Sequence, residues 1–365
     1  MASKDIEKPV DKAKGVWTQA EILSEPSCWE ACLKILGREN HPTKLRQMFA
    51  ADGDWLITGC GSSYYAALVA AATWTSLTHE RAHAFPASEI LLFPELVVPP
   101  SRNWRPILIS RSGHTSEVLK AAEYLEKERN LRTLAVSCVG SQPLEGLSSL
   151  TVVLPPADEK SMVMTRSFSC MILALQFLAA GWAGNSEFQD ALGKISAPIE
   201  RLLEGLPTRL EQFVAANEFE DYVFLGQGPL YGIANEAMLK VKEMSCSYAQ
   251  CFHTLEFRHG PKAIVSPRTL VTFFISEAGY TAERGMLEEV KSLGGISLVV
   301  TNRADAAIRR AADFLVELNL DVPEYARSVA YIPAAQLLGL YTGRKKGIDS
   351  DRPPNLSRAV ILQGD

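Results

Sequence analysis

The sequence predicts an α/β protein made of two tandem doubly wound parallel sheets, each with helices on both faces. Apolar strands alternate with amphipathic helices along the 365 residues, and the alternation occurs twice. The strand and turn that end near Gly59 resemble those that end near Gly226. The next pair of matching strands ends at Ser110, 51 residues after Gly59, and at Ser276, 50 residues after Gly226. Strands that alternate with helices form parallel sheets through right-handed crossovers.

Residues 1–45 precede the first strand and are predicted to form an N-terminal helical extension. One helix is expected from Thr18 and another at about 28–36. Such an extension packs most often on its own domain or on a partner subunit. The stretch at 187–207 is predicted to bridge the two copies.

Two domains follow from the repeat, the first at 46–195 and the second at 205–365. Ligands of doubly wound sheets bind beyond the carboxyl ends of the strands, where the turns at 59–64 and 110–115 are expected to lie. The predicted strands are 55–59, 107–110, 134–137 and 150–154 in the first domain, and 222–226, 273–276, 298–301 and 314–318 in the second.

The turn at 110–115 is a candidate phosphate site. It reads Ser-Arg-Ser-Gly-His-Thr, and Ser110, Ser112 and Thr115 offer hydroxyls at the start of a predicted helix, whose positive end stabilises anions. The sequence lacks the G-x-x-x-x-G-K-[ST] nucleotide loop, so a small phosphorylated metabolite is a better prediction than a nucleoside triphosphate. An ordinary serine-rich turn is the alternative.

The second copy does not repeat these hydroxyls. Ser112 corresponds to Ala278, and Arg111 corresponds to Glu277, whose charge would repel a phosphate. The second copy is therefore expected to contribute something other than a phosphate site.

A lysine and a glutamate mark the helix predicted at 231–248 in the second copy. Lys240 and Glu243 are three residues apart and share a helix face, and an ammonium beside a carboxylate can hold it ionised and ready to accept a proton. A solvated surface ion pair is the alternative. The loop at 253–261 adds His259, which suits either proton transfer or a structural hydrogen bond.

The composition argues against several classes of function. A formal net charge of -5 disfavours binding to nucleic acid or to an anionic membrane surface. The charged N-terminus has no apolar signal region, and the apolar stretches, 171–183 included, are too short or too polar to span a membrane. A cytoplasmic protein is expected.

No metal and no cofactor are predicted. The seven cysteines include no C-x-x-C pair, and their odd number favours reduced, mostly buried thiols over disulfides or a zinc site. Residues 79–83 spell H-E-x-x-H, the zinc-protease signature. That chemistry needs one continuous helix, whereas this stretch follows a predicted helix end near Thr78 and runs into Pro86.

Five motifs carry a resemblance to a known family, and they occur in order at 59–64, 110–115, 239–243, 258–261 and 354–358. Over residues of about 45 to 365 the chain resembles the sugar isomerase, or SIS, domain superfamily, and within it the isomerase half of glucosamine-6-phosphate synthase. It resembles more closely the tagatose-6-phosphate ketose/aldose isomerase branch, also assigned as galactosamine-6-phosphate deaminase/isomerase. The stretches at 17–22, 26–29 and 157–168 carry that closer likeness. The resemblance implies flavodoxin-like domains.

The resemblance implies that the first domain binds a phosphorylated sugar. Glu243 would be the base that moves a proton between C1 and C2, assisted by Lys240, while His259 would help to open the ring from a neighbouring subunit. A homodimer or higher homo-oligomer is therefore implied. The residues expected to bind the substrate or to line its pocket are Cys60, Gly61, Ser62, Ser63, Ser110, Arg111, Ser112, Thr115 and Met162.

Two residues depart from the synthase pattern. Arg111 stands where the synthase has glutamine, and a guanidinium can pair bidentately with a phosphate, so tighter phosphate binding is expected. Arg358 stands where the synthase has a lysine proposed to form an imine with the open-chain ketose. Arginine stays protonated, so Arg358 can orient the substrate as a fixed cation but cannot form that imine.

The expected reaction is proton transfer on an open-chain sugar phosphate. The chain opens with Met1 and Ala2 and has no room for the glutamine-hydrolysing domain of the synthase, so glutamine-dependent synthesis is not expected. An amino-sugar 6-phosphate deaminase/isomerase is favoured. A plain aldose-ketose isomerase, a fructosamine-6-phosphate deglycase and a non-catalytic sugar-phosphate sensor are the alternatives.

Overall fold

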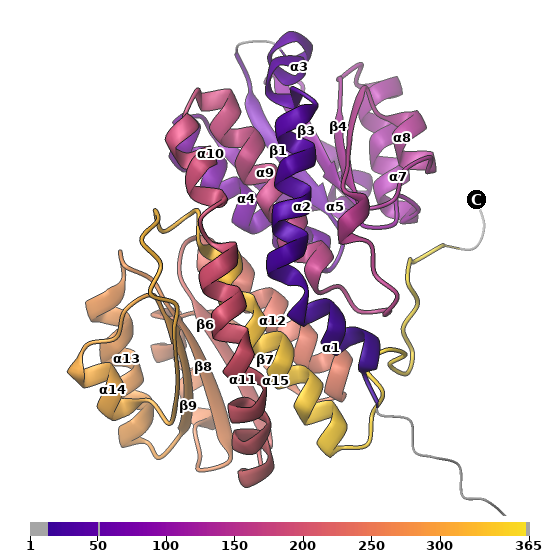
Figure 1. Ribbon diagram of the computed structural model, residues 1–365. Helices are drawn as coiled ribbons and strands as arrows, with labels where there is room; N and C mark the ends of the chain where they lie inside the picture. Colours follow the sequence, from indigo (N-terminus) through magenta and orange to yellow (C-terminus); the bar gives the residue numbers. More distant parts are fainter. Residues whose placement is uncertain (1–13, 50–51, 363–365) are drawn as a thin grey trace, which may run out of the picture.

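The computed structural model describes residues 14–49 and 52–362, which form two halves stacked one above the other (Figure 1). Each half is built on a five-stranded sheet in which all strand pairs are parallel. The first sheet has the order β2-β1-β3-β4-β5 and the second the order β10-β9-β8-β6-β7. Numbered from its own first strand, each sheet reads 2-1-3-4-5, so the predicted fold class and the repeat are confirmed.

The strands of the first sheet are β1 (Asp54–Gly59), β2 (Ala82–Pro86), β3 (Trp104–Ile109), β4 (Leu134–Ser137) and β5 (Leu150–Val153). Those of the second sheet are β6 (Asp221–Gly226), β7 (Ala249–His253), β8 (Thr269–Ile275), β9 (Ile296–Thr301) and β10 (Phe314–Glu317). The eight strands expected from the apolar runs lie among these ten, with small shifts at their ends.

Two strands, β2 and β7, were not expected from the sequence. Each forms one edge of its sheet and is at most partly buried along most of its length, so neither has the apolar run of a central strand. β2 carries His83 and ends on Pro86, and β7 ends on His253, which was expected in a loop. The stretch at 79–83 accordingly is no helix: His79 ends the preceding helix in a left-handed conformation, and His83 lies in β2.

Helices cover both faces of each sheet (Figure 1). In the first half and the extension they are α1 (Val16–Leu23), α2 (Glu25–Arg38), α3 (His41–Met48), α4 (Ser62–Thr78), α5 (Ala87–Leu92), α6 (Pro94–Val97), α7 (Ser116–Glu123), α8 (Pro143–Leu147), α9 (Arg166–Ala183) and α10 (Ser186–Leu192). Then follow α11 (Ser196–Ala216), α12 (Pro229–Ser245), α13 (Tyr280–Ser292), α14 (Ala306–Ala311) and α15 (Ile332–Lys345).

The N-terminal helices fasten the two halves together. α1 packs on α15 of the second half, and α2 packs on α9 of the first half and on α11. The indole of Trp29 in α2 donates a buried hydrogen bond of 2.8 Å to Ser169 Oγ, and Asp351 accepts one of 2.7 Å from the backbone N–H of Thr18. The extension therefore packs on its own chain, which was one of the two arrangements expected from the sequence.

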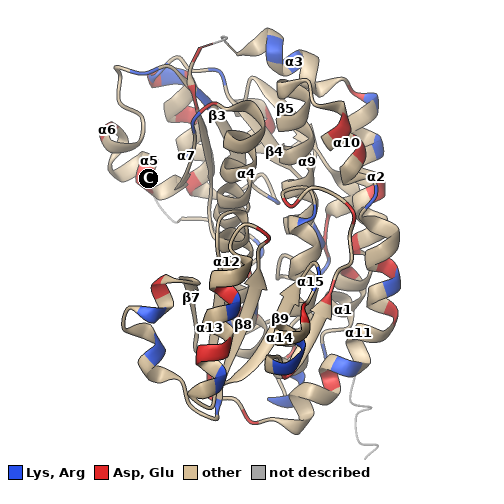
Figure 2. Cartoon of the chain, turned by 90° about the vertical axis from the view of Figure 1, so that its left-hand side faces the viewer, with Lys and Arg blue, Asp and Glu red and all other residues tan. Residues whose placement is uncertain are grey.

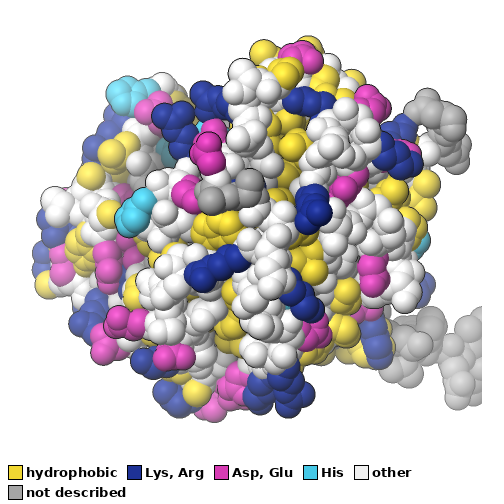
Figure 3. Space-filling view, turned by 90° about the horizontal axis from the view of Figure 1, so that it is seen from above, with side chains coloured by type: hydrophobic (Ala, Val, Ile, Leu, Met, Phe, Trp, Pro, Cys, Tyr) yellow, Lys and Arg dark blue, Asp and Glu magenta, His cyan; other side chains and the backbone are white. Residues whose placement is uncertain are grey.

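The halves share one apolar core, which includes residues of α2, α4, α9, α12 and α15. α9 is apolar and long enough to cross a membrane by length and composition, but 72% of it is buried inside the protein. α9 is therefore a helix of the shared apolar core beneath the first sheet. On the outer face of the first half, acidic and basic side chains are interspersed rather than separated by sign (Figure 3).

One glycine allows α4 and α12 to meet at the junction of the halves (Figure 2). A Cβ on Gly232 would lie 2.6 Å from Val69 Cγ2 and 2.8 Å from the backbone oxygen of Tyr65. Both distances are shorter than a non-bonded contact allows. Because the Tyr65 oxygen belongs to a helix backbone, it cannot move aside as the end of a side chain could.

We expect Gly232→Ala to destabilise the protein by about 1–3 kcal/mol through overpacking. Alanine gains at most about 1 kcal/mol over glycine in a helix, so the clash outweighs the propensity. Denaturant unfolding measures the difference. Gly205→Ala in α11 is the matched control, because its Cβ would meet nothing within 4 Å and should stabilise slightly. An unchanged or higher stability for Gly232→Ala would contradict the close packing.

Candidate active site

A cavity of about 280 Å³ opens where the turns after β1 and β3 meet α12 and the C-terminal tail. Its size suits a small metabolite. Ten of the predicted site residues line it, namely Cys60, Gly61, Ser62, Ser63, Arg111, Ser112, Thr115, Met162, Glu243 and Arg358. The other predicted residues, Ser110, Lys240 and His259, do not line it. Leu356, Ser357 and Val360 of the tail close one side.

Two strand-to-helix turns form one wall of the cavity. Gly61 has φ 55 and leads into α4, and Gly113 has φ 67 in the turn before α7; both angles favour glycine. Ser110 is buried, and its hydroxyl accepts a 3.1 Å bond from the N–H of Gly113 and lies 3.2 Å from Thr115 Oγ1. Ser110 thus braces the turn, while Ser112 and Thr115 stand at the cavity.

The thiol of Cys60 lies on the same wall. Burial raises the pKa of Cys60 to about 12, so the group is neutral at physiological pH. The thiolate, not the thiol, is the nucleophile of cysteine chemistry. Cys60 therefore lines the cavity as a neutral thiol.

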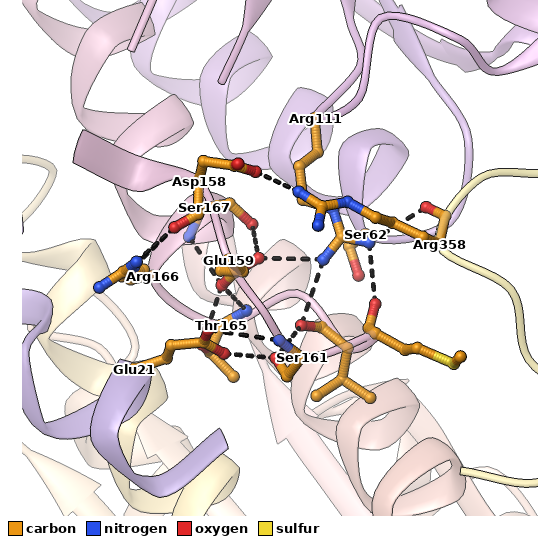
Figure 4. Close-up of polar contacts among 12 residues, drawn as sticks. Glu21, Ser62, Arg111, Asp158, Glu159, Ser161, Thr165, Arg166, Ser167 and Arg358 are labelled. Atoms are coloured by element: carbon orange, nitrogen blue, oxygen red, sulfur yellow. Dashed lines mark hydrogen bonds and ion pairs between the residues drawn. The ribbon is translucent and has the colours of Figure 1, made fainter. Parts of the chain in front are cut away.

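Arg111 lies at the cavity with its charge already balanced inside the protein (Figure 4). Its guanidinium pairs with the fully buried carboxylate of Glu159 at 3.0 Å and donates to the backbone oxygens of Met162 at 2.8 Å and Arg358 at 3.1 Å. Arg111 therefore ties together the loop that carries Met162, the C-terminal tail and the hydroxyl-rich turn. Direct phosphate contact by Arg111 remains a prediction.

Glu159 and Glu21 hold the same loop in place. Glu159 accepts hydrogen bonds from the backbone N–H and the hydroxyl of Thr165, at 2.6 and 2.9 Å, and also from Ser167. Glu21 comes from the N-terminal extension and accepts from the N–H of Lys160 at 2.5 Å and from Ser161 (Figure 4). Burial raises the pKa of Glu21. Neither carboxylate was expected at the site from the sequence.

Glu243 lines the opposite wall, and a buried lysine held between two glutamates lies behind it. Lys240 is fully buried in α12, where it pairs with Glu243 and lies 3.3 Å from Glu236 Oε1. Ser62 of the first half donates to Glu236 at 3.0 Å and accepts from Lys240 at 3.3 Å. The shared helix face of Lys240 and Glu243 is confirmed, and a fully solvated surface pair is wrong because Lys240 is buried.

The protonation of this cluster follows from its burial. Burial raises the pKa of Glu236 to about 8 against the opposing effect of Lys240, so this carboxyl is largely protonated at neutral pH. Burial alone would lower the pKa of Lys240, but Glu236 and Glu243 outweigh it and the net shift is upward. The lysine therefore stays a cation beside the one partly exposed carboxylate, Glu243. No role for Glu236 was expected from the sequence.

His259 and Arg358 lie apart from this wall. His259 is exposed in the turn after the short helix Glu256–Arg258, and it does not reach the cavity of its own chain. Arg358 lies in the tail at the cavity, where its side chain pairs with Asp158. The supply of His259 by a neighbouring subunit remains a prediction.

The corresponding turn of the second half is filled by a carboxylate of the protein itself. Glu283 of α13 accepts hydrogen bonds from the N–H of Ser276 at 2.7 Å and from its hydroxyl at 3.1 Å. Glu277 also lies beside the turn, where it pairs with Arg327. These contacts give a physical reason why the second turn is not expected to bind phosphate.

Glu283→Gln tests this assignment through the pH dependence of stability. Burial raises the pKa of Glu283 to about 7 from 4.5, so its protonated form favours folding; that stability is present below pH 4.5 and is lost as pH rises through 7. Glutamine does not titrate. Between pH 5 and 8 the parent should therefore lose on the order of 2 kcal/mol relative to the variant in denaturant unfolding. If the stability of the parent and of Glu283→Gln changed with pH in the same way, the assignment of Glu283 as a buried, titrating carboxyl would be wrong.

The repeated fold and the turns at its strand ends have known counterparts. The SIS domain profile matches residues 48–181 and 220–338. The chain belongs to the SIS domain family. It is 29% identical over 361 residues to glutamine–fructose-6-phosphate aminotransferase [isomerizing] of Pseudomonas aeruginosa, which covers 94% of this chain and 58% of the relative. The homologue of Idiomarina loihiensis is also 29% identical, with coverage of 84% and 51%. The chain thus spans about half the length of these curated relatives.

Solved SIS structures superpose over nearly the whole chain. Glucosamine-6-phosphate deaminase from Thermotoga maritima is 30% identical, with a TM-score of 0.76 and coverage of 94% of this chain and 99% of that one. Tagatose-6-phosphate ketose/aldose isomerase from Escherichia coli gives a TM-score of 0.83 at 20% identity, covering 96% and 97%, which supports the fold alone. These SIS relatives are named as enzymes, so the prediction of an enzyme is confirmed at the level of the family.

Proposed function

We propose that this SIS protein is an amino-sugar 6-phosphate deaminase/isomerase, which converts galactosamine or glucosamine 6-phosphate to the ketose 6-phosphate and ammonia. One observation carries the proposal. Glu243, paired with a buried lysine, faces a cavity of about 280 Å³ whose other wall is a hydroxyl-rich turn at a helix N-terminus. A base and an anion site thus lie within one small-molecule cavity. The likeness to the deaminase from Thermotoga maritima supports the reaction.

The phosphate end of the substrate fits the wall of the first half. Ser63, Ser112 and Thr115 offer hydroxyls, and an anion placed there would lie at the N-termini of α4 and α7, whose positive ends stabilise it. Placing the phosphate on this wall directs the carbon chain toward α12. The reacting end of the sugar then lies beside Glu243.

At that end Glu243 takes the C2 proton of the open-chain amino sugar and returns a proton to C1, which gives the 2-ketimine. Water adds to the ketimine and ammonia leaves, so the ketose 6-phosphate remains. The Lys240 ammonium, held by two glutamates, stabilises negative charge on the substrate oxygen as the proton leaves. Arg358 orients the substrate as a fixed cation. In a homodimer, His259 of a second copy would assist ring opening.

A plain aldose-ketose phosphosugar isomerase is the second candidate. The cavity lining contains one carboxylate, Glu243, and the proposed mechanism uses it as the base. A second anionic group that would bind the substrate ammonium is therefore missing from the described lining. Glu243 can perform the same C2-to-C1 transfer on a sugar with oxygen at C2.

Substrate assays decide between these functions. Purified protein is incubated separately with galactosamine 6-phosphate and glucosamine 6-phosphate, and released ammonia and ketose 6-phosphate are measured. We expect stoichiometric ammonia and ketose from one or both. Ketose formed only from galactose or glucose 6-phosphate would instead support the plain isomerase. Ammonia-free cleavage of fructosamine 6-phosphate to glucose 6-phosphate and an amine would identify a deglycase, and binding without turnover would identify a sensor.

Ser112→Ala tests the phosphate wall. A hydrogen bond to a charged group is worth about 1.5–3 kcal/mol, so we expect KM to rise about 10- to 100-fold with kcat little changed. Steady-state kinetics with the best substrate from the assays above measures both constants. Ser292→Ala, at an exposed position of α13, is the control and should leave both unchanged. A fall in kcat with KM unchanged would argue against a phosphate role.

A further inference from the structure

Three cysteines that are far apart in the sequence meet in the core of the first half. Cys28 and Cys32 lie one turn apart on α2, and Cys170 faces them from α9. The sulfurs of Cys28 and Cys170 are 3.4 Å apart, and all three sulfurs lie within 4.8 Å of one another. All three side chains are buried and none is in a disulfide. The cluster was not predicted from the sequence, because Cys170 lies 142 residues from Cys28.

The packing of α2 on α9 sets this arrangement. Trp29, next to Cys28, donates to the hydroxyl of Ser169, next to Cys170, so the register of the two helices is held by a buried hydrogen bond. Residues four apart share a helix face, which aligns Cys28 with Cys32 toward the partner helix. Two packed helices, rather than loops, therefore hold the three sulfurs close to one another.

We propose that Cys28, Cys32 and Cys170 form a binding site for one soft, thiophilic cation, with Cu(I) as the best match. Thiolates select soft cations such as Cu(I), and a single cation about 2.3 Å from three sulfurs places them about 4.0 Å apart. The 3.4 Å between the sulfurs of Cys28 and Cys170 and the 4.8 Å upper limit on the other two sulfur distances lie on either side of that value. Each sulfur that binds the cation releases its proton to solvent.

The ligand set separates Cu(I) from zinc. Structural zinc sites take four ligands in a tetrahedron, whereas no fourth cysteine, histidine or carboxylate joins this group among the described residues. The nearest polar neighbour is the Pro156 carbonyl, which accepts a 3.1 Å bond from Cys28. Three sulfur ligands in a closed site suit trigonal coordination of a monovalent cation.

The surroundings also favour an anionic cluster of sulfurs. Arg166 lies one turn before Cys170 on α9 and bridges Ser24 Oγ and the Asp158 carbonyl, close enough to act electrostatically on Cys28 and Cys32. Burial raises the pKa of Glu25, the fully buried carboxyl near Cys28, well above its usual value, so its neutral form is favoured there. The Arg166 guanidinium supplies positive charge near the sulfurs.

A competition titration tests the site. The full-length protein is reduced, freed of metal and titrated anaerobically with Cu(I) against a chromogenic Cu(I) chelator of known affinity. We expect one Cu(I) bound per chain, with three sulfur neighbours in X-ray absorption spectra. Each of Cys28→Ala, Cys32→Ala and Cys170→Ala should weaken binding more than about 100-fold, because even outer-shell partners of metals contribute 10- to 100-fold.

Two matched variants serve as controls. Cys138→Ala removes a buried thiol outside the cluster, and Cys246→Ala removes an exposed one; both should keep the Cu(I) site. Thermal melts confirm that each variant is folded. The X-ray absorption spectrum of the unaltered chain reports the number of sulfur neighbours of Cu(I) without the need for any variant. The proposal would be overturned if the parent protein did not bind Cu(I) tightly. Unchanged Cu(I) affinity in Cys32→Ala would also overturn it, as would zinc binding to the site as tightly as Cu(I). A Cys28–Cys170 disulfide in a protein that binds no Cu(I) when reduced would identify a redox pair instead.

Discussion

Glu243→Gln should lower kcat about 10³-fold, within the range that positioned general bases contribute, while the affinity for the sugar phosphate changes only a few-fold. Glutamine has nearly the same shape as glutamate but cannot accept the C2 proton. The variant should fold, because the Glu236 carboxyl stays 3.3 Å from Lys240 and ionises more readily once the charge of Glu243, which raises its pKa, is removed. The substitution thus removes the base and spares the phosphate wall.

Three measurements separate this outcome from a loss of structure. Steady-state kinetics gives kcat, calorimetric titration with the substrate gives affinity, and proton exchange at C2 in deuterated water reports the first chemical step alone. All turnover and C2 exchange should fall together while binding persists. Glu220→Gln is the control, since Glu220 is an exposed partner of Arg268 far from the cavity. Turnover retained in Glu243→Gln would falsify the assignment of the base.

The fold could be predicted from the sequence because its signals are local and repeated. Central strands such as β3 and β8 are buried along their whole length and read as apolar runs, and the second copy repeats the spacing of the first. The edge strands β2 and β7 lack this signal because water reaches them. His253, at the end of β7, looked like a loop residue for the same reason.

The candidate site could be predicted only where one motif supplies the chemistry. The hydroxyl-rich turn and the Lys240–Glu243 pair are each contained within six residues or fewer. The groups that hold them come from far away: Glu159 lies 48 residues from Arg111, and Glu21 lies 139 residues from Lys160. Such pairings depend on how helices and loops pack, which no local pattern reveals.

Glu159→Ala should cause the largest loss of stability among the changes at this site, about 3–5 kcal/mol, because it leaves the buried Arg111 guanidinium without its counter-charge. It also removes the acceptor for the N–H and hydroxyl groups of Thr165 and Ser167. Asp158→Ala is the control in the neighbouring residue. Asp158 pairs with Arg358 at a partly exposed position, and such a pair is worth at most about 1 kcal/mol.

A double variant separates the two costs of losing Glu159. In Arg111→Met/Glu159→Ala no charge is left unpaired, so we expect part of the lost stability to return. Denaturant unfolding of the two single variants and the double variant measures the coupling. Additive losses would contradict a direct charge pair between Arg111 and Glu159.

Glu159→Ala also tests whether Arg111 faces the substrate phosphate. In the parent the guanidinium is neutralised by Glu159, so inorganic phosphate should raise Tm only as far as the hydroxyls and helix N-termini bind it. In Glu159→Ala the guanidinium lacks a counter-charge, so phosphate at the cavity should raise Tm by more than it does in the parent. Arg111→Met/Glu159→Ala should lose that extra gain. An equal phosphate response in all three proteins would mean that Arg111 serves only to hold the loop and the tail together.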